Sequence, residues 1–125
     1  MSLVDEQFRL AESEYGGAHL TSRPDGTYVV EIPNLPLPPG WSKSRTSVKF
    51  IVPVGFPHAV PDCFWTDQDL RLASNADPQA SNIQPLPGTS EVHRWFSWHA
   101  NKWAPNRDSL MTYIKIIEAR LREAR

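Results

Sequence analysis

The stretch that decides the fold is residues 47–66, Ser-Val-Lys-Phe-Ile-Val-Pro-Val-Gly-Phe-Pro-His-Ala-Val-Pro-Asp-Cys-Phe-Trp-Thr. Its first six residues place a valine, a phenylalanine and a valine on alternate positions, which is the period of a β-strand. Its last four residues are mostly aromatic or β-branched and indicate a second, shorter strand. The glycine and prolines between them predict a turn over residues 55–61. The stretch therefore predicts two consecutive strands, 47–52 and 63–66.

Two more strands are expected upstream. Residues 18–21 and 28–32 flank Arg23-Pro24-Asp25-Gly26, a strong turn signal, and the pair reads as a hairpin. Residues 4–13 carry apolar side chains at helical spacing and predict a first helix. Residues 33–41 contain four prolines, which lack the backbone donor of a sheet ladder, so we expect an extended loop there.

Downstream, residues 67–92 show little periodicity and are expected to be irregular. A helix is predicted from about Asn106, a reasonable N-cap, to Arg125. It has an apolar stripe, and Arg120, Arg122 and Arg125 suit its last turn as a solvated helix end. Such a helix is stable only when packed on the sheet, because ordering its backbone costs more than burying its stripe returns. The predicted class is α+β: an N-terminal helix, a four-stranded antiparallel meander, a long irregular segment and a C-terminal helix.

Length and composition exclude several classes of protein. The 125 residues predict one domain, residues 1–125, and the formal net charge of −1 gives no electrostatic drive toward nucleic acid or acidic membranes. The only cysteine is Cys63, which fits a reducing compartment. With no signal peptide and no apolar run long enough to span a bilayer, we expect a cytoplasmic protein. No glycine-rich phosphate loop is present, and no cofactor is expected.

The order of the elements, with the motifs inside them, resembles the ubiquitin-conjugating (E2/UBC) superfamily. The motifs are Phe56-Pro57 followed by Pro61, Phe64-Trp65-Thr66, and Trp103-Ala104-Pro105. Three further segments are similar to prokaryotic E2 family E, namely Leu35–Trp41, Phe64–Leu72 and Arg94–His99. The resemblance covers almost the whole chain. It implies a UBC-like fold and a role in a bacterial ubiquitin-like modification system, with a ubiquitin-like protein and an E1-like adenylating protein as partners.

The same resemblance predicts a member without the usual catalytic residue. An E2 enzyme carries its cargo as a cysteine thioester, about eight residues before the tryptophan of its Trp-x-Pro motif. Here that position is Trp95, whose indole forms no thioester, and the His-Pro-Asn motif is missing. We therefore expect a non-catalytic E2-like protein, although whether the chain is an enzyme stays open.

Three residues are candidates for chemistry. Cys63 is either a small buried core residue or a relocated nucleophile, and Asp62 beside it would raise its pKa. His93 and His99 are general bases, ligands of a metal with Asp67 or Asp69, residues that recognise a ligand or partner, or hydrogen-bonded residues that pack against tryptophans. Their spacing does not place both imidazoles on one helical face, so no metal site is predicted.

Partner contacts are expected from apolar side chains. An aromatic cluster contains Trp95 and Trp98, and the proline-rich loop contributes Leu37 and Trp41. These residues either form core or anchor an interface.

Three hypotheses follow from these residues. The first is a non-catalytic E2-like protein that binds a ubiquitin-like protein or an E1-like partner. The second is an active conjugating enzyme with an unusual nucleophile, either Cys63 or His93/His99. The third is an interaction module on the same scaffold without a ubiquitin-like partner.

Overall fold

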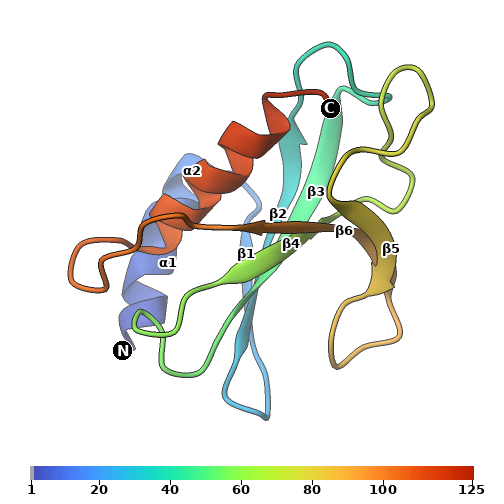
Figure 1. Ribbon diagram of the computed structural model, residues 1–125. Helices are drawn as coiled ribbons and strands as arrows, with labels where there is room; N and C mark the ends of the chain where they lie inside the picture. Colours follow the sequence, from blue (N-terminus) through green and yellow to red (C-terminus); the bar gives the residue numbers. More distant parts are fainter. Residues whose placement is uncertain (1) are drawn as a thin grey trace.

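The computed structural model describes residues 2–125 and confirms the α+β class (Figure 1). Along the chain, one helix precedes six strands and a second helix follows them. The elements are α1 Leu3–Glu14, β1 His19–Ser22, β2 Tyr28–Pro36, β3 Arg45–Val52, β4 Asp62–Thr66, β5 Ser81–Pro85, β6 Val92–His99 and α2 Leu110–Leu121. The arrangement is consistent with a UBC-like fold. No helix within residues 2–125 has the length and apolar character needed to cross a membrane.

The sheet has six strands, two more than the four that the sequence predicted. Its order is β1-β2-β3-β4-β6-β5, with every neighbouring pair antiparallel. The first four strands form the predicted meander. The aromatic run at 92–99 is a strand that pairs with β4, and β5 lies inside the segment expected to be irregular. That edge strand is short and none of its residues is fully buried, so it shows no apolar alternation.

The prediction of a loop over residues 33–41 was wrong in its first part, because β2 continues to Pro36. The register shifts between Ile32 and Leu35, so Pro33 sits in a bulge where no ladder donor is needed. Pro36 is the last residue of the strand and pairs with Arg45. Bulges and strand ends are the places where a sheet tolerates proline.

The predicted C-terminal helix exists but is shorter than expected. It begins at Leu110, with Ser109 rather than Asn106 at the N-cap, and ends at Leu121. Residues 104–108 form a turn in which Asp108 accepts a bond from the Ala104 amide at 2.7 Å. The Asp108 carboxylate is used in this turn and therefore does not cap the first turn of a helix that begins near residue 106.

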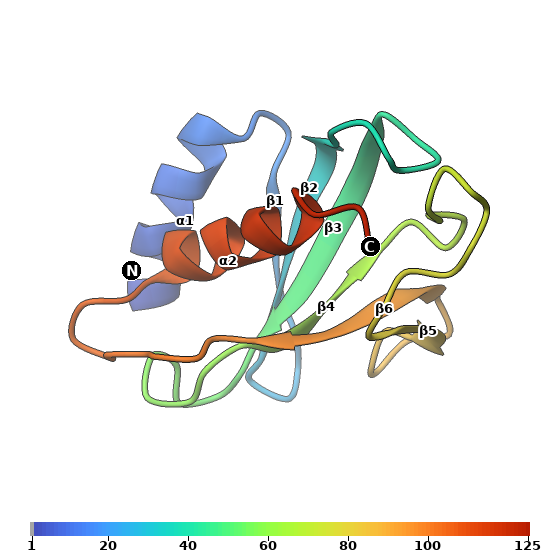
Figure 2. The same ribbon diagram turned by 45° about the horizontal axis from the view of Figure 1, so that its top comes forward.

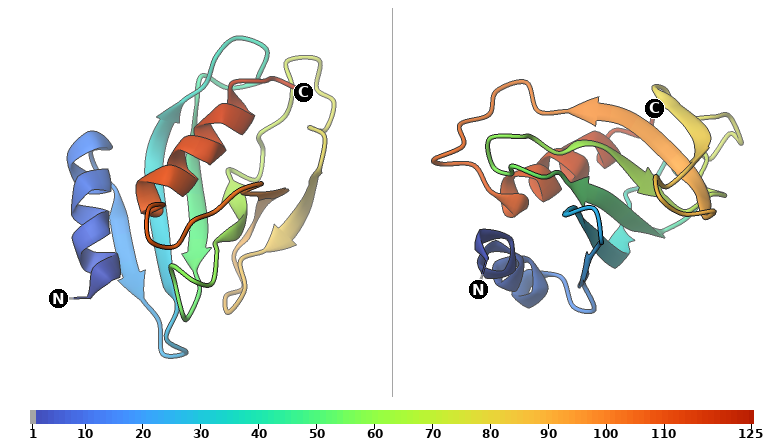
Figure 3. Two further views of the ribbon diagram at one scale, coloured as in Figure 1. Left: turned by 60° about the vertical axis from the view of Figure 1, so that its left-hand side comes forward. Right: turned by 90° about the horizontal axis from the view of Figure 1, so that it is seen from below.

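Both helices lie on the same face of the sheet (Figures 2 and 3). They are joined by side chains: Tyr15 donates to Glu118 at 2.5 Å, and Lys115 bonds Glu14 at 2.9 Å. The core between helices and sheet is apolar and tightly stacked. Phe64 of β4 and Phe96 of β6 stack with ring centroids 4.9 Å apart and an interplanar angle of 4°. The added strand β6 is therefore part of the main core.

Candidate functional site

A pocket of about 380 Å³ opens between α2 and the chain that leaves β6. Trp98, His99 and Asn101 line one wall, while Ile116 and Arg120 of α2 line the other. Figure 2 shows the segment after β6 running alongside α2 before it turns back into the helix. The pocket thus combines apolar walls with a few polar groups, which is the usual composition of a ligand site.

His99 is held by Asp62 of the neighbouring strand. The two residues are register partners, and His99 Nδ1 lies 3.2 Å from Asp62 Oδ1. Both side chains are about two-thirds exposed. A carboxylate on Nδ1 favours the tautomer whose Nε2 is free to accept a proton or a hydrogen bond. The same pair also lines a shallow hollow of about 430 Å³ with Trp103.

Cys63 lies next to Asp62 in β4 and is half-buried, not the buried core residue that one interpretation of the sequence expected. It sits in β4 where the register with β6 shifts, and its φ is +71°. Its carbonyl accepts a bond from the Tyr113 hydroxyl at 2.9 Å. Burial raises the pKa of the Cys63 thiol, and Asp62 adds to that effect, although a hydrogen bond with Trp95 opposes it. Little thiolate therefore exists at neutral pH, and the thiolate is the reactive form.

His93 lies at the opposite end of β6. Its Nε2 is 3.3 Å from Glu91, whose carboxylate also bonds Lys49 at 3.0 Å. Six residue steps along the strand separate it from His99, which corresponds to about 20 Å. The structure does not bring the two histidines together.

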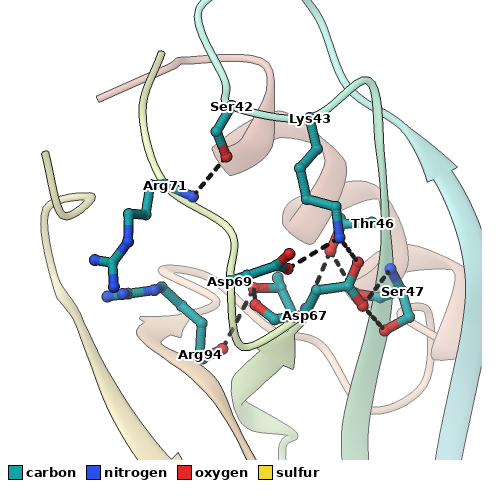
Figure 4. A network of polar contacts seen from close by, with 9 residues as sticks. Ser42, Lys43, Thr46, Ser47, Asp67, Asp69, Arg71 and Arg94 are labelled. Atoms are coloured by element: carbon teal, nitrogen blue, oxygen red, sulfur yellow. Dashed lines mark hydrogen bonds and ion pairs between the residues drawn. The ribbon is translucent and has the colours of Figure 1, made fainter. Parts of the chain in front are cut away.

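Asp67 and Asp69 form ion pairs with Lys43, whose Nζ lies 2.6 Å and 3.0 Å from their carboxylates (Figure 4). Ser47 also donates to Asp67 at 2.6 Å. Burial alone would raise the pKa of Asp67, but the bonds from Lys43 and Ser47 outweigh it and lower the pKa. Within residues 2–125, no group of three or more His, Cys, Asp or Glu side chains is placed to hold a metal ion.

The four residues expected to contact partners lie in different surroundings. Trp41 is only 6% exposed, and its Nε1 donates to the Leu121 carbonyl at 2.8 Å, so little of its surface is open to a partner. Leu37 is half-buried against the core. Trp95 is half-buried in the middle of β6, paired with Trp65 and Asn82. Trp98 is the one of the four that lines the pocket.

Sequence reasoning missed Arg120, which was expected at a solvated helix end. Its side chain is 1% exposed. It donates to the carbonyls of Glu123, Gln79 and Arg125 at 3.0, 2.9 and 2.7 Å. Burial, with repulsion from Arg125, lowers the pKa of the guanidinium. One signal was available: Arg120 falls three residues after Ile117 and seven after Tyr113, on the buried stripe of the helix.

The motifs that carried the family resemblance meet in space. Trp103 donates from Nε1 to the Pro57 carbonyl at 2.8 Å, and its ring lies 6.1 Å from that of Phe56. The turn after β3 thus supports the segment that leads into α2.

Comparison with known proteins agrees with these observations. The model of the family described as prokaryotic E2 family E matches residues 3–124. No curated protein and no solved structure matches the chain. The family match covers nearly every residue of the six-stranded sheet and both helices, and on that ground the chain belongs to prokaryotic E2 family E.

Proposed function

We propose that this E2-like protein binds a ubiquitin-like protein, or its E1-like activating partner, without carrying the ubiquitin-like protein as a cysteine thioester. The setting is a bacterial, cytoplasmic modification system, as the family suggests. The observation that carries the proposal is the environment of Cys63, the only cysteine of the chain. Its backbone is tied to α2 through Tyr113, and its thiol has a raised pKa.

Thioester transfer needs an accessible thiolate with a cationic neighbour or a base to activate it. The groups that bond to Cys63 or act on its thiol are Asp62, Trp95, Trp98 and the phenol of Tyr113, and none of these is a cation. His99 lies one step further away and bonds to Asp62. Trp95, at the position counted back from Trp103, lies in the middle of a paired strand and offers an indole. Both observations support binding rather than acyl transfer through sulfur.

The pocket beside α2 supplies a place for such binding. Trp98 and Ile116 offer apolar surface, and His99 and Asn101 offer hydrogen-bonding groups at the mouth. An extended segment of a partner suits a concave pocket of this composition better than a flat protein surface does.

The test uses the E1-like and ubiquitin-like proteins of the same modification system. Wild-type protein and Cys63→Ala are incubated with both partners and ATP, then run on non-reducing gels, while calorimetry measures binding of the ubiquitin-like protein. We expect binding that Cys63→Ala leaves within twofold, and no reductant-sensitive adduct. An adduct that disappears in Cys63→Ala refutes the proposal. Absence of any binding to either partner favours an interaction module with other partners.

A second candidate function is supported by the contact between His99 and Asp62. A carboxylate-oriented imidazole at the pocket edge is the arrangement of a general base. In that case the chain takes part in conjugation: a substrate amine attacks the carbonyl of the ubiquitin-like protein that is activated on the E1-like partner, the bond to that activating group breaks and the group leaves, and His99 accepts the proton of the amine. His99→Gln then lowers the conjugation rate at least tenfold while binding of the ubiquitin-like protein is retained. Equal rates exclude this role.

A further inference from the structure

We infer that β5 pairs with the same strand of a second copy of the chain, so that two sheets join edge to edge in a twofold-symmetric dimer. The partner is a second copy of this protein, and the contact is an antiparallel strand pair. The inference does not depend on the proposed function, because it uses the edge of the sheet and not the pocket beside α2.

The strand β5 is the open edge of the sheet. It pairs with β6 on one side only, and it lies on the side of the molecule away from α1 (Figure 1). The opposite edge strand, β1, is flanked by α1, because Phe8 of the helix and Leu20 of the strand line the same hollow. A strand added beside β1 would therefore meet the helix. Neither helix runs along β5 (Figure 1).

The register determines which backbone groups of β5 point outward. Ala80 and Leu86, which flank the strand, bond through their backbones to the opposite side of the β5–β6 hairpin at 2.8 and 2.9 Å. Because antiparallel strands bond at alternate residues, the backbone groups of Ser81, Ile83 and Pro85 point away from β6. Proline has no N–H. The open edge therefore presents the N–H groups of Ser81 and Ile83 and the carbonyls of all three residues.

This pattern of donors and acceptors is complementary to itself. When two copies of β5 align antiparallel about Ile83, each Ile83 faces its counterpart and each Ser81 faces Pro85 of the second copy. The Ile83 N–H then donates to the facing Ile83 carbonyl, and the Ser81 N–H donates to the facing Pro85 carbonyl. Every outward donor thus finds an acceptor, and the missing N–H of Pro85 removes only one bond at each end.

The side chains of β5 allow two identical strands to meet. Its sequence, Ser-Asn-Ile-Gln-Pro, contains no charged residue. Like charges that face each other across a strand pair are destabilising, so a charged strand would repel its own copy. Soluble proteins commonly place charges on an open edge for this reason. The strand β5 lacks that protection.

Apolar side chains are exposed beside the same edge. Ile83 is 37% exposed, and Val92 of the neighbouring strand is 41% exposed. The register pairs Ile83 with Arg94 and Pro85 with Val92, so Ile83 and Val92 are diagonal neighbours on one face of the sheet. In the dimer the two Ile83 side chains lie against each other on that face, which removes them from water.

In the single chain, a side chain takes the place of the second copy at the central donor. The Asn82 Oδ1 accepts from the Ile83 amide at 2.8 Å. The Asn82 side chain is exposed and can rotate away, so it competes with the second copy without blocking it. One pair of short strands buries less area than a standard interface of about 1,200–2,000 Å². We therefore expect a weak dimer, with a dissociation constant of about 100 μM.

The test measures the mass of the full chain by sedimentation equilibrium at concentrations up to about 1 mM. Ile83→Lys places two like charges opposite each other and should weaken the dimer at least tenfold. Asn82→Ala removes the competing acceptor and should strengthen it at least threefold. Val54→Lys makes the same change as Ile83→Lys at an exposed position in the turn after β3 and should leave the dissociation constant within twofold of wild type.

A second measurement does not depend on the strength of the dimer. In Ile83→Cys the two new thiols face each other, with Cα atoms about 5.5 Å apart, which is within the range of a disulfide. Mild oxidation should give a reductant-sensitive dimer with Ile83→Cys and none with Val54→Cys, and both variants retain Cys63. A monomer at every concentration overturns the inference, and so does a dimer that Ile83→Lys leaves unchanged.

Discussion

Replacing Tyr113 by phenylalanine tests how the two strands beside the pocket are held to α2. The Tyr113 side chain is fully buried. Its hydroxyl lies 2.9 Å from the Cys63 carbonyl in β4 and 3.0 Å from the Trp98 carbonyl in β6. Burial raises the pKa of the phenol, so the hydroxyl keeps its proton and acts as a donor at all physiological pH values. Tyr113→Phe removes this donor and keeps the ring.

The magnitude follows from what the substitution leaves behind. A buried polar group that loses its partner destabilises a protein by about 1–3 kcal/mol, and here two carbonyls share one donor. We take about 2 kcal/mol as the expected loss. An unfolding entropy of about 2.1 cal/mol/K per residue converts this loss into a decrease in Tm of about 8 °C for a chain of this length.

The assay is thermal unfolding followed by circular dichroism, with Tyr28→Phe as the matched control. Tyr28 is half-buried, and its hydroxyl bonds to no other group in residues 2–125, so its replacement should stay within about 0.5 kcal/mol of the wild type. Tyr113→Phe should also increase the reaction rate of Cys63 with a thiol reagent, because β4 loses a tether. A Tm within about 2 °C of wild type for Tyr113→Phe refutes the tethering role.

Three further predictions concern other parts of the chain. In native protein the Cys63 thiol should react with a colorimetric thiol reagent far more slowly than in denaturant; fast native reaction with an apparent pKa below about 8.5 contradicts the structural role. Because the pKa of Asp67 is lowered in the folded state, its contribution to stability is present above about pH 4 and is lost as pH falls through the folded pKa. Asp67→Asn should therefore show a smaller loss of urea resistance between about pH 4 and pH 2, and identical pH slopes contradict this. Gly40→Ala should destabilise by more than about 1 kcal/mol, because φ is +108° and the new Cβ lies 2.6 Å from that of Ala124. Gly16→Ala, whose new Cβ meets nothing within 4 Å, is the control and should not destabilise in the same urea titration.

Local patterns in the sequence were sufficient for α1 and for the four-stranded meander. Residues 47–52 alternate strictly, and the observed strand buries Val48, Phe50 and Val52 as that alternation predicts. The edge strand β5 could not be predicted in this way. Ser81–Pro85 forms a strand because β6 lies beside it, and that pairing is a tertiary contact with no local signature.

The candidate site was only partly predictable, for a related reason. Trp98 and His99 were selected by residue type, and the structure places both on one pocket. His93 was selected by the same criterion, yet it lies at the other end of β6, away from the pocket. Arg120 was overlooked because a charged residue near a helix end is usually solvated, and its position on the buried stripe was not weighed against that rule.

The strand β6, which the sequence did not predict, also explains why the pocket lies beside α2. Side chains of β6 alternate, so Phe96 and Trp98 face the helices together, yet Phe96 is fully buried and Trp98 is half-buried. The strand therefore leaves the core between these two residues. Arg120 lies over both rings, which places its charge at the boundary between core and pocket. At this boundary the guanidinium is held by backbone oxygens of Gln79, Glu123 and Arg125, so it ties two other segments of the chain to α2. Substitutions of Arg120 should consequently destabilise the fold, because they leave these buried backbone oxygens without a donor.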